Sequence, residues 1–296
     1  MAITTSTPSV EELDAVVRVL SAWQSDDRRA ELHPGDIGWF RRFGAERTAD
    51  AIRLWSRGGQ VLAVGLLDGP DVLRLEFVPD AMHDEELARR VAEDASAPRR
   101  GVLPEGEAYV AAPPGALVRQ ALVRGGWEDD AAWTPLRRDL GEPVPDPGVH
   151  IEVVGPEQAA ERTAVQRSAF AASTFTVDRW HTMAAAPPYA AARCLLARDD
   201  RGDPVAAVTV WSAGAGRPGM IEPMGVHADH RGHGYGRAIT LAAARALRAL
   251  GSSGVVVDTP SSNTAAVATY RSAGLRRLPE VRDLRRSGIR GPVPGR

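Results

Sequence analysis

The chain has 296 residues, of which 44% are hydrophobic and 25% charged, with a formal net charge of −2 and a pI near 6.4. This composition supplies ordinary packed cores for two medium-sized domains. It offers no basic patch for a nucleic acid, no apolar stretch approaching the roughly 18 residues of a membrane span, and no signal-peptide pattern at the N-terminus. We therefore expect a cytoplasmic protein that binds neither nucleic acids nor membranes.

Two features of residue usage exclude certain kinds of chemistry. The sequence contains no lysine, so all 36 basic residues are arginine, which excludes a lysine nucleophile or a phosphate-loop lysine. Cys194 is the only cysteine, so the chain can form neither an internal disulfide nor a thiolate zinc cluster. Because it lies in the apolar run 192–197, Cys194 is expected to be a buried strand thiol.

In the first half of the chain, hydrophobic periodicity predicts alternating helices and strands. The expected helices cover residues 10–23, 84–95 and 115–124. The expected strands cover residues 51–54, 60–67, 72–78 and 108–111.

The clearest boundary in the chain is residues 141–148, which hold three prolines and two glycines. Such a segment cannot continue a helix or a central strand, so we interpret it as a linker between domains at 1–140 and 149–296.

After this linker, the same kind of pattern continues to residue 272. The expected strands cover residues 150–154, 192–197, 205–212, 220–226 and 254–258. The expected helices cover residues 156–171, 177–185, 235–250 and 263–272. Gly126-Trp127 and Gly274-Leu275 each follow a strand and a helix. The two halves are therefore interpreted as weak repeats of one plan, in which the first half has lost its polar chemistry.

The chemistry of the second half centres on the segment His230-Arg-Gly-His-Gly-Tyr-Gly-Arg237, which follows a strand and opens a helix. Alternate glycines let the backbone N–H groups turn inward, and the helix N-terminus adds free donors, which together suit a pyrophosphate. A dinucleotide-binding loop would place a glycine where Arg237 stands, although Asp258 imitates its ribose-binding acid. A plain glycine-rich turn is the other alternative.

A second motif decides between these alternatives. Arg231-x-x-Gly-x-Gly236 together with Asn263-x-x-Ala-x-x-x-Tyr-x-x-x-Gly-Leu275 resembles the paired signature of the GNAT superfamily of N-acetyltransferases, with Leu275 in place of the usual phenylalanine. The likeness is specific over residues 220–276. It extends by topology to residues 150–290 and weakly to the first half, as in tandem members with a degenerate N-terminal copy.

The resemblance implies an α/β fold of two tandem GNAT-like domains, each a mixed, splayed β-sheet flanked by helices. The degenerate domain would cover residues 1–140, and the catalytic domain residues 149–296. Acyl-CoA, by default acetyl-CoA, would lie in the splay of the second sheet. The residues that the resemblance assigns to this co-substrate are Met224, Gly225, Val226, Arg231, Gly232, His233, Gly234, Tyr235, Gly236, Arg237 and Asn263.

Two side chains are candidates for catalysis. The resemblance places Tyr270 beside the sulfur of the thioester, where its hydroxyl can protonate the leaving thiolate or hydrogen-bond to it; a packed helix tyrosine is the alternative. Glu222 is a carboxylate within an apolar strand, which predicts a raised pKa suited to a general base. A structural carboxylate at the end of the strand is an equally good interpretation of Glu222.

The remaining expectations concern the acceptor and metals. His227, His230 and His233 precede the helix and lack acidic ligand spacing, so we expect solvated histidines and no metal. Residues available for an acceptor pocket are Phe170, Phe175, Trp180, His181, Tyr189 and Trp211. The expected reaction is direct transfer of an acyl group, by default acetyl, to a small-molecule amine, and the absence of a basic patch argues against a strongly anionic one. The alternatives are a mycothiol-synthase-like acetyltransferase and a non-catalytic acyl-CoA-binding module.

Overall fold

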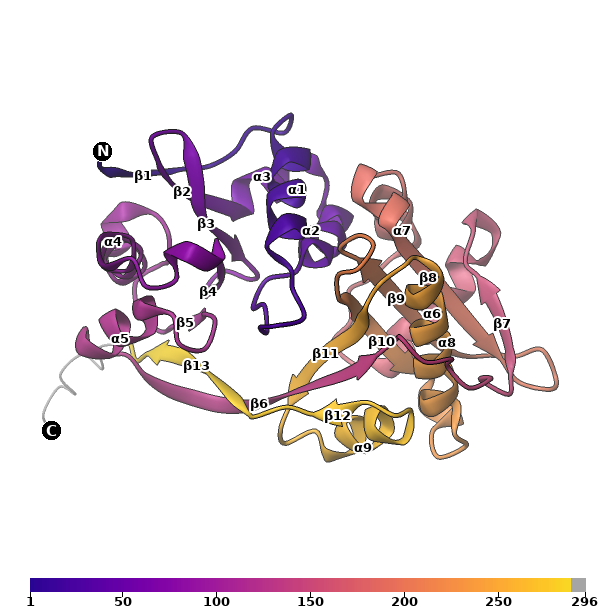
Figure 1. Ribbon diagram of the computed structural model, residues 1–296. Coiled ribbons are helices and arrows are strands. Elements are labelled where there is room, and N and C mark those ends of the chain that lie inside the picture. Colours follow the sequence, from indigo (N-terminus) through magenta and orange to yellow (C-terminus); the bar gives the residue numbers. More distant parts are fainter. Residues whose placement is uncertain (289–296) are drawn as a thin grey trace, which may run out of the picture.

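Both halves of the chain repeat one arrangement of strands and helices in the computed structural model, which describes residues 1–288 (Figure 1). The first half contains the helices α1 (Leu13–Trp23), α2 (Pro34–Phe40), α3 (Ala45–Ala51), α4 (Glu85–Ser96) and α5 (Leu117–Arg124). Its strands are β1 (Ile3–Ser6), β2 (Ile52–Arg57), β3 (Gln60–Leu67), β4 (Val72–Phe77), β5 (Ala108–Ala111) and β6 (Glu128–Asp139).

The second half follows after residues 141–148, which form neither a helix nor a strand. Its helices are α6 (Ala159–Ala169), α7 (Val177–Ala184), α8 (Tyr235–Ala249) and α9 (Thr264–Ser272). Its strands are β7 (His150–Val153), β8 (Ala192–Arg198), β9 (Pro204–Ser212), β10 (Gly219–Val226), β11 (Gly254–Pro260), β12 (Arg276–Arg277) and β13 (Val281–Arg286).

The expected fold class is confirmed. In each half an antiparallel run of strands leads through a helix, α4 or α8, to a parallel strand, β5 or β11. Within residues 1–288 the strands of both halves join in one sheet, in the order β1-β2-β3-β4-β5-β13-β6-β11-β10-β9-β8-β7, and β12 pairs with β6.

The two halves are joined by an exchange of strands. The long strand β6 leaves the first half and pairs with β11, from Pro260↔Trp133 to Gly254↔Asp139. In return β13 pairs with β5 of the first half through Leu284↔Val110 (Figure 1). Each half is therefore completed by a strand from the other half.

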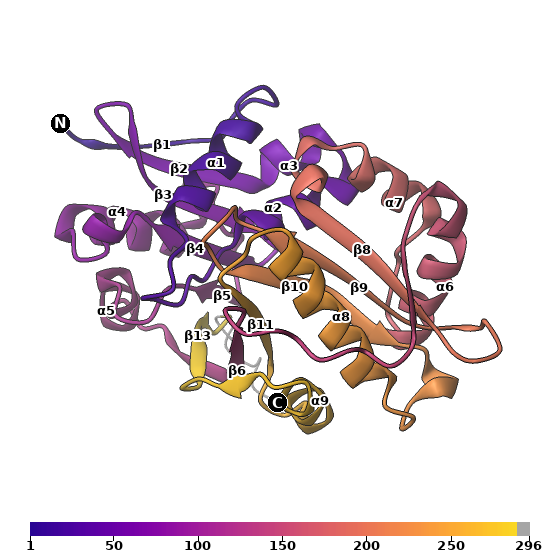
Figure 2. The ribbon, with the colours of Figure 1, turned by 45° about the vertical axis from the view of Figure 1, so that its right-hand side comes forward.

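The core of the second half lies on both faces of β9, because side chains alternate across a strand. Val208 and Val210 pack in one cluster with residues of α8, whereas Ala207 and Trp211 pack in another with Val165 of α6. Figure 2 shows α8 lying across the strands of this half. Cys194 is buried on β8 within the second of these clusters, which confirms the expected strand thiol. Among residues 1–288, no helix is long and apolar enough to cross a membrane.

Several elements differ from the predicted ones. The strand expected from residue 51 begins at Ile52, because α3 ends at Ala51. The sequence pattern missed α2, α3, β1, β6, β12 and β13. Of these, β6 and β13 alternate poorly because charged residues fill much of both strands, and their partners lie in the other half of the chain.

Candidate active site

The site is built where β10 and β11 separate. These strands pair only at Gly219↔Val255 and Met220↔Val256, whereas β10 keeps pairing with β9 as far as Val226↔Ala206. The register of β10 shifts between Ile221 and Met224. Past the last β11 pair, the edge of β10 facing β11 therefore has no partner strand within the described part of the chain, and its backbone is free to bind an extended ligand.

Two cavities meet at this separation. The first, which we call the splay pocket, has a volume of about 610 Å³ and is lined by residues of β10, β11, α9 and the loop after α6. The second, the interdomain cavity, has a volume of about 680 Å³ and extends between the two halves. Glu222 and Arg42 line both, so the side chain expected to act as a base lies where the two cavities join.

The loop before α8 presents a row of free backbone donors. Gly232 and Gly234 have φ angles of +82° and +86°, and a Cβ on either would meet no atom within 4 Å. Among the described residues, none of the backbone N–H groups from Gly232 to Arg237 has a hydrogen-bond acceptor. Six such groups at the N-terminus of a 15-residue helix form a binding site for an anion such as pyrophosphate.

The side chains of this loop brace it against neighbouring helices. Arg231 donates from Nη2 to the Ala169 carbonyl at 2.9 Å, and Arg237 donates from Nε to the Ser272 carbonyl at 3.0 Å. Gly236 has a separate reason to lack a side chain, because its Cβ would lie 2.8 Å from Thr269 Cγ2 on α9. The loop thus offers its backbone to the ligand while its side chains fix its position.

Glu222 lies half-buried at the register shift of β10. Its backbone carbonyl accepts a hydrogen bond of 2.8 Å from Trp211 Nε1, and its carboxylate has no hydrogen-bond partner among the described residues. Burial raises the pKa of Glu222 to about 7, and the charge of Asp36 acts in the same direction against the opposing charge of Arg74. A carboxyl with this pKa exchanges protons near neutrality, as a general base must.

Tyr270 lines the same pocket from α9 with a side chain that is 6% exposed. Burial raises the pKa of its hydroxyl above the usual range, and the charge of Glu222 raises it further. The hydroxyl therefore keeps its proton and can donate a hydrogen bond. Asn263 also lines the pocket, and its Oδ1 accepts the Ala266 N–H at 3.1 Å, which caps α9.

The first half of the chain supplies several residues of the site that belong to no sequence motif. Asp36, Arg42 and Arg74 line the interdomain cavity with Glu222. Sequence reasoning missed them because they belong to the half without the signature. A local signal was present in the spacing Gly35-x-x-Gly38 on α2, since small residues spaced by a helical turn permit close packing against another element.

That close packing joins α2 to the strand beside Glu222. A Cβ on Gly35 would lie 2.3 Å from Trp211 Cβ, and a Cβ on Gly38 would lie 2.4 Å from Trp211 Cζ3. Trp211, which holds the Glu222 carbonyl, is itself held by the first half of the chain.

Replacing Gly38 with valine is therefore expected to displace Trp211 and lower kcat by about tenfold, because small misplacements of catalytic groups are costly. The affinity for CoA, measured by calorimetry, should not change. Gly141→Val is the matched control, since a Cβ there would meet no atom within 4 Å. Equal kcat values for wild type and Gly38→Val would show that the contact between Trp211 and α2 does not position Glu222.

The aromatic residues proposed for the acceptor pocket divide into two groups. Phe170 and Phe175 line the splay pocket. Trp180, Tyr189 and Trp211 pack in the core beneath it, and His181 is exposed and lines neither cavity. The pocket walls missing from this prediction come from Trp39, Arg42 and Phe43 of the first half.

The three loop histidines lie near the surface before α8. The rings of His227 and His230 are 5.4 Å apart, and His233 Nδ1 lies 2.9 Å from the Arg231 carbonyl. Among the described residues, no cluster of three or more histidine, cysteine or acidic side chains has the arrangement of a metal site.

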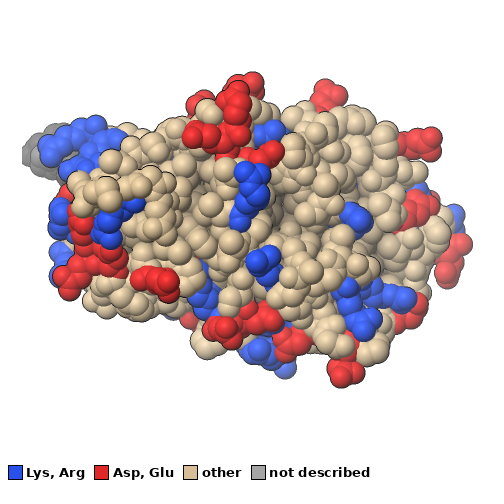
Figure 3. All heavy atoms as spheres, turned by 45° about the horizontal axis from the view of Figure 1, so that its top comes forward, with Lys and Arg blue, Asp and Glu red and all other residues tan. Residues whose placement is uncertain are grey.

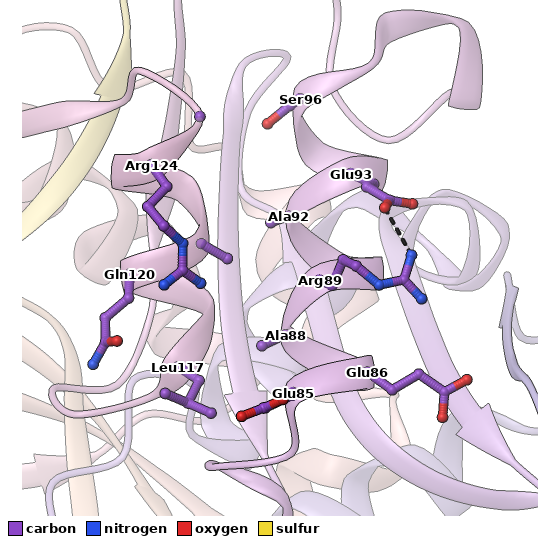
Figure 4. Close-up of a pocket in the computed structure, with 12 residues that line it drawn as sticks. Glu85, Glu86, Ala88, Arg89, Ala92, Glu93, Ser96, Leu117, Gln120 and Arg124 are labelled. Carbon is purple, nitrogen blue, oxygen red and sulfur yellow. Dashed lines mark hydrogen bonds and ion pairs between the residues drawn. The ribbon is translucent and has the colours of Figure 1, made fainter.

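The first half has lost the corresponding anion site. At the start of α4, the Asp84 carboxylate accepts the Leu87 N–H at 2.9 Å, and Glu85 and Glu86 follow in the first turn. The adjacent groove between α4 and α5, of about 820 Å³, is also lined by Glu93 (Figure 4). Carboxylates thus occupy the place where the second half leaves N–H groups free.

The splay of the first half is also filled by its own chain. Strands β4 and β5 pair only from Val72 to Arg74. Arg28 enters the gap beyond and forms an ion pair with Glu76 at 2.7 Å, while the Glu31 N–H donates to Glu76 Oε2 at 2.7 Å. The loop that carries these residues takes the space that an extended ligand would need.

Comparisons with known proteins agree with this geometry. Residues 161–275 match the sequence model of the acetyltransferase (GNAT) family, so the second half carries an acetyltransferase domain of the GNAT family. The match covers the register shift, the free N–H loop and Tyr270. No curated protein matches the sequence.

Solved structures share the fold over almost the whole chain. A GCN5-related N-acetyltransferase from Sphaerobacter thermophilus is 21% identical, with 97% of each chain covered and a TM-score of 0.59. A tandem GNAT protein from the clavulanic acid biosynthesis pathway is 17% identical, covering 96% of this chain and 98% of its own, with a TM-score of 0.57. A GCN5-related N-acetyltransferase from Kribbella flavida is 19% identical, covering 95% and 96%, with a TM-score of 0.55. The first half therefore has a GNAT-like fold as well.

Proposed function

We propose that this protein transfers an acyl group, by default acetyl, from acyl-CoA to the amine of a small molecule, and that the second half alone binds the donor. The observation that carries the proposal is the presence of Glu222 and Tyr270 in one pocket, at the end of a strand edge that leads from the free N–H groups of the α8 loop. The match of residues 161–275 to the acetyltransferase (GNAT) family model supports acyl transfer in general.

The chain provides a fitting place for each part of the donor. The pyrophosphate would accept hydrogen bonds from the N–H groups between Gly232 and Arg237, supported by the dipole of α8. The pantetheine arm would hydrogen-bond to the free edge of β10 from Met224 to Val226, as an added strand does. The thioester would then lie between Glu222 and Tyr270.

In the proposed reaction, the acceptor nitrogen attacks the carbonyl carbon directly, the new C–N bond forms and the C–S bond breaks. Glu222 takes the proton that the nitrogen loses, either directly or through water. Tyr270 donates a hydrogen bond to the sulfur as negative charge develops, which stabilises the leaving thiolate. The thiolate is protonated from solvent, and Glu222 returns its proton to solvent, so atoms and charges balance.

A catalytic role is favoured over that of a mere CoA-binding module. Binding the donor requires neither an unpaired carboxyl with a pKa near 7 nor a buried hydroxyl beside it. Both groups are costly to keep in a half-buried pocket, and each has a purpose when a proton and a thiolate must be handled.

The first test is donor binding. Gly234→Glu should reduce the affinity for CoA at least about tenfold, because a side chain at φ +86° is strained and its carboxylate would repel a pyrophosphate. Calorimetry with CoA measures this. Gly115→Glu in the first half is the matched control, with a similar φ of +84° and open surroundings. Undiminished affinity in Gly234→Glu would remove the assignment of the donor site.

The second test is a screen of small amines with acetyl-CoA, in which release of free CoA reports turnover. At least one amine should release CoA at a rate that depends on its concentration. If no amine accelerates release above the background hydrolysis of acetyl-CoA while CoA still binds, the protein is a binding module rather than a transferase.

A further inference from the structure

Three arginine side chains from the two halves gather around one aromatic ring at the splay pocket. The guanidinium carbons of Arg42, Arg47 and Arg179 lie 4.2, 4.8 and 5.1 Å from the centroid of Phe43. Arg42 also lies 4.1 Å above the ring of Trp39. Arg42 and Arg179 line the pocket itself, so two guanidinium groups face the space where acceptor and donor meet.

None of these three arginines forms a close ion pair with a carboxylate among residues 1–288, although the charges of Asp68 and Glu222 act on Arg42 from farther away. Arg42 donates from Nη1 to the Trp39 carbonyl at 2.8 Å, and Arg179 donates from Nη1 to the carbonyl and hydroxyl of Thr174 at 2.8 and 2.7 Å. Burial lowers the pKa of Arg42 to about 10; the charges of Asp68 and Glu222 oppose this shift, and the charges of Arg179 and Arg47 add to it. Like charges held together in a partly desolvated place favour an anion between them.

A fourth guanidinium lies behind the pocket wall. Arg162 is 1% exposed and donates to the amide oxygen of Gln166, the hydroxyl of Thr209 and the sulfur of Cys194. In the part of the chain that the structure describes, it forms no ion pair with a carboxylate. Its guanidinium carbon lies 4.5 Å from the ring centroid of Phe175. Because Gln166 and Phe175 line the pocket, this buried positive charge adds to the potential inside the pocket.

We propose that the acceptor carries an anionic group, a carboxylate or a phosphate, and that Arg42 and Arg179 bind it. This inference rests on the proposed transferase activity. A guanidinium group matches the geometry of both anions and can bind either through two parallel hydrogen bonds. Arg42 lies with Glu222 in the wall common to both cavities. The anion therefore anchors one end of the acceptor and its amine reaches Glu222.

This differs from the expectation that the acceptor is not strongly anionic. The face shown in Figure 3 mixes charges of both signs without a broad basic field, as the sequence indicates. The arginines meet only in the folded chain, because Arg42 and Arg47 come from the first half and Arg179 from α7. A short charged cluster of this kind leaves no basic run in the sequence.

The test uses pairs of amines that differ only in the anionic group. γ-Aminobutyrate is compared with its amide, and glucosamine 6-phosphate with glucosamine, in wild type, Arg42→Gln and Arg179→Gln, with CoA release as the readout. Wild type should prefer the anionic member of at least one pair, and the pair that shows the preference distinguishes carboxylate from phosphate. Each arginine variant should lose that preference by ~10- to 100-fold, through KM, as for a charge-assisted hydrogen bond.

The controls separate this inference from the proposed function. Arg201→Gln, in the exposed loop before β9, should keep the preference, and calorimetry should show unchanged CoA affinity in both test variants. The inference fails if wild type shows no preference for the anionic amine, or if an arginine variant slows both members of a pair equally. It also fails if the variants lose activity only with succinyl-CoA as donor, because the arginines would then bind the carboxylate of the acyl group rather than that of the acceptor. In each of these cases, turnover of the amines without an anionic group would show that the protein is still a transferase. No turnover with any amine would overturn both.

Discussion

Glu222→Gln should lower kcat by on the order of 100-fold or more, the usual contribution of a general base. In wild type, kcat/KM should rise with pH through about 7, because that is the pKa to which burial raises Glu222 and only the ionised carboxyl accepts a proton. The variant should lose this limb. Initial rates of CoA release between pH 5 and 9 measure both effects.

Two controls are needed for this result. The acceptor amine also loses a proton as pH rises, so the profile must be repeated with amines of different pKa. A limb that moves with the acceptor does not belong to Glu222.

The second control is stability. Because the pKa of Glu222 in the folded protein, about 7, is above the ordinary glutamate value of 4.5, the folded state binds more protons than the unfolded state between these pH values. The contribution of protonated Glu222 to the free energy of unfolding is therefore lost as the pH rises through this window. Glutamine should leave Tm at pH 8 unchanged or higher, and a lower Tm would identify Glu222 as an anchor of the strand.

Tyr270→Phe should lower kcat by ~10- to 1,000-fold with little change in the affinity for acetyl-CoA, because the hydroxyl acts on charge that develops only in the transition state. Steady-state kinetics and calorimetry with CoA separate the two quantities. Phenylalanine keeps the ring packed in α9, where Tyr270 is 6% exposed.

The matched control is Tyr109→Phe, which removes an exposed hydroxyl that donates to Glu107 in the first half at 2.7 Å. This variant should retain wild-type kcat. If Tyr270→Phe does as well, the hydroxyl of Tyr270 has no part in the reaction and the residue serves packing alone.

The parts of the site that the sequence predicted are those made by short segments. The loop from Gly232 to Gly236 and the helix from Asn263 to Tyr270 each specify their own local geometry, through positive φ angles and an N-cap. Their types and spacing can therefore be recognised without knowing the fold.

The parts that were missed depend on contacts between distant residues. Trp211 is fixed by Gly38, and Arg42 meets Arg179 around Phe43. No periodicity links these residues, because they become neighbours only when α2 packs on β9 and the turn Arg41–Phe43 packs on α7. The aromatic residues Trp180 and Tyr189 show the reverse case, in which a plausible pocket residue belongs to the core.

The exchange of β6 and β13 determines when each half can complete its fold during synthesis of the chain. The first half emerges from the ribosome with a gap between β5 and β6 that only Val281–Arg286 can fill. The second half, in turn, packs Leu136 and Leu140 from the first half into its core. Neither half can therefore complete its fold without a strand from the other half. Until β13 has been synthesised, the nascent chain exposes an unpaired strand edge that must be kept from aggregating.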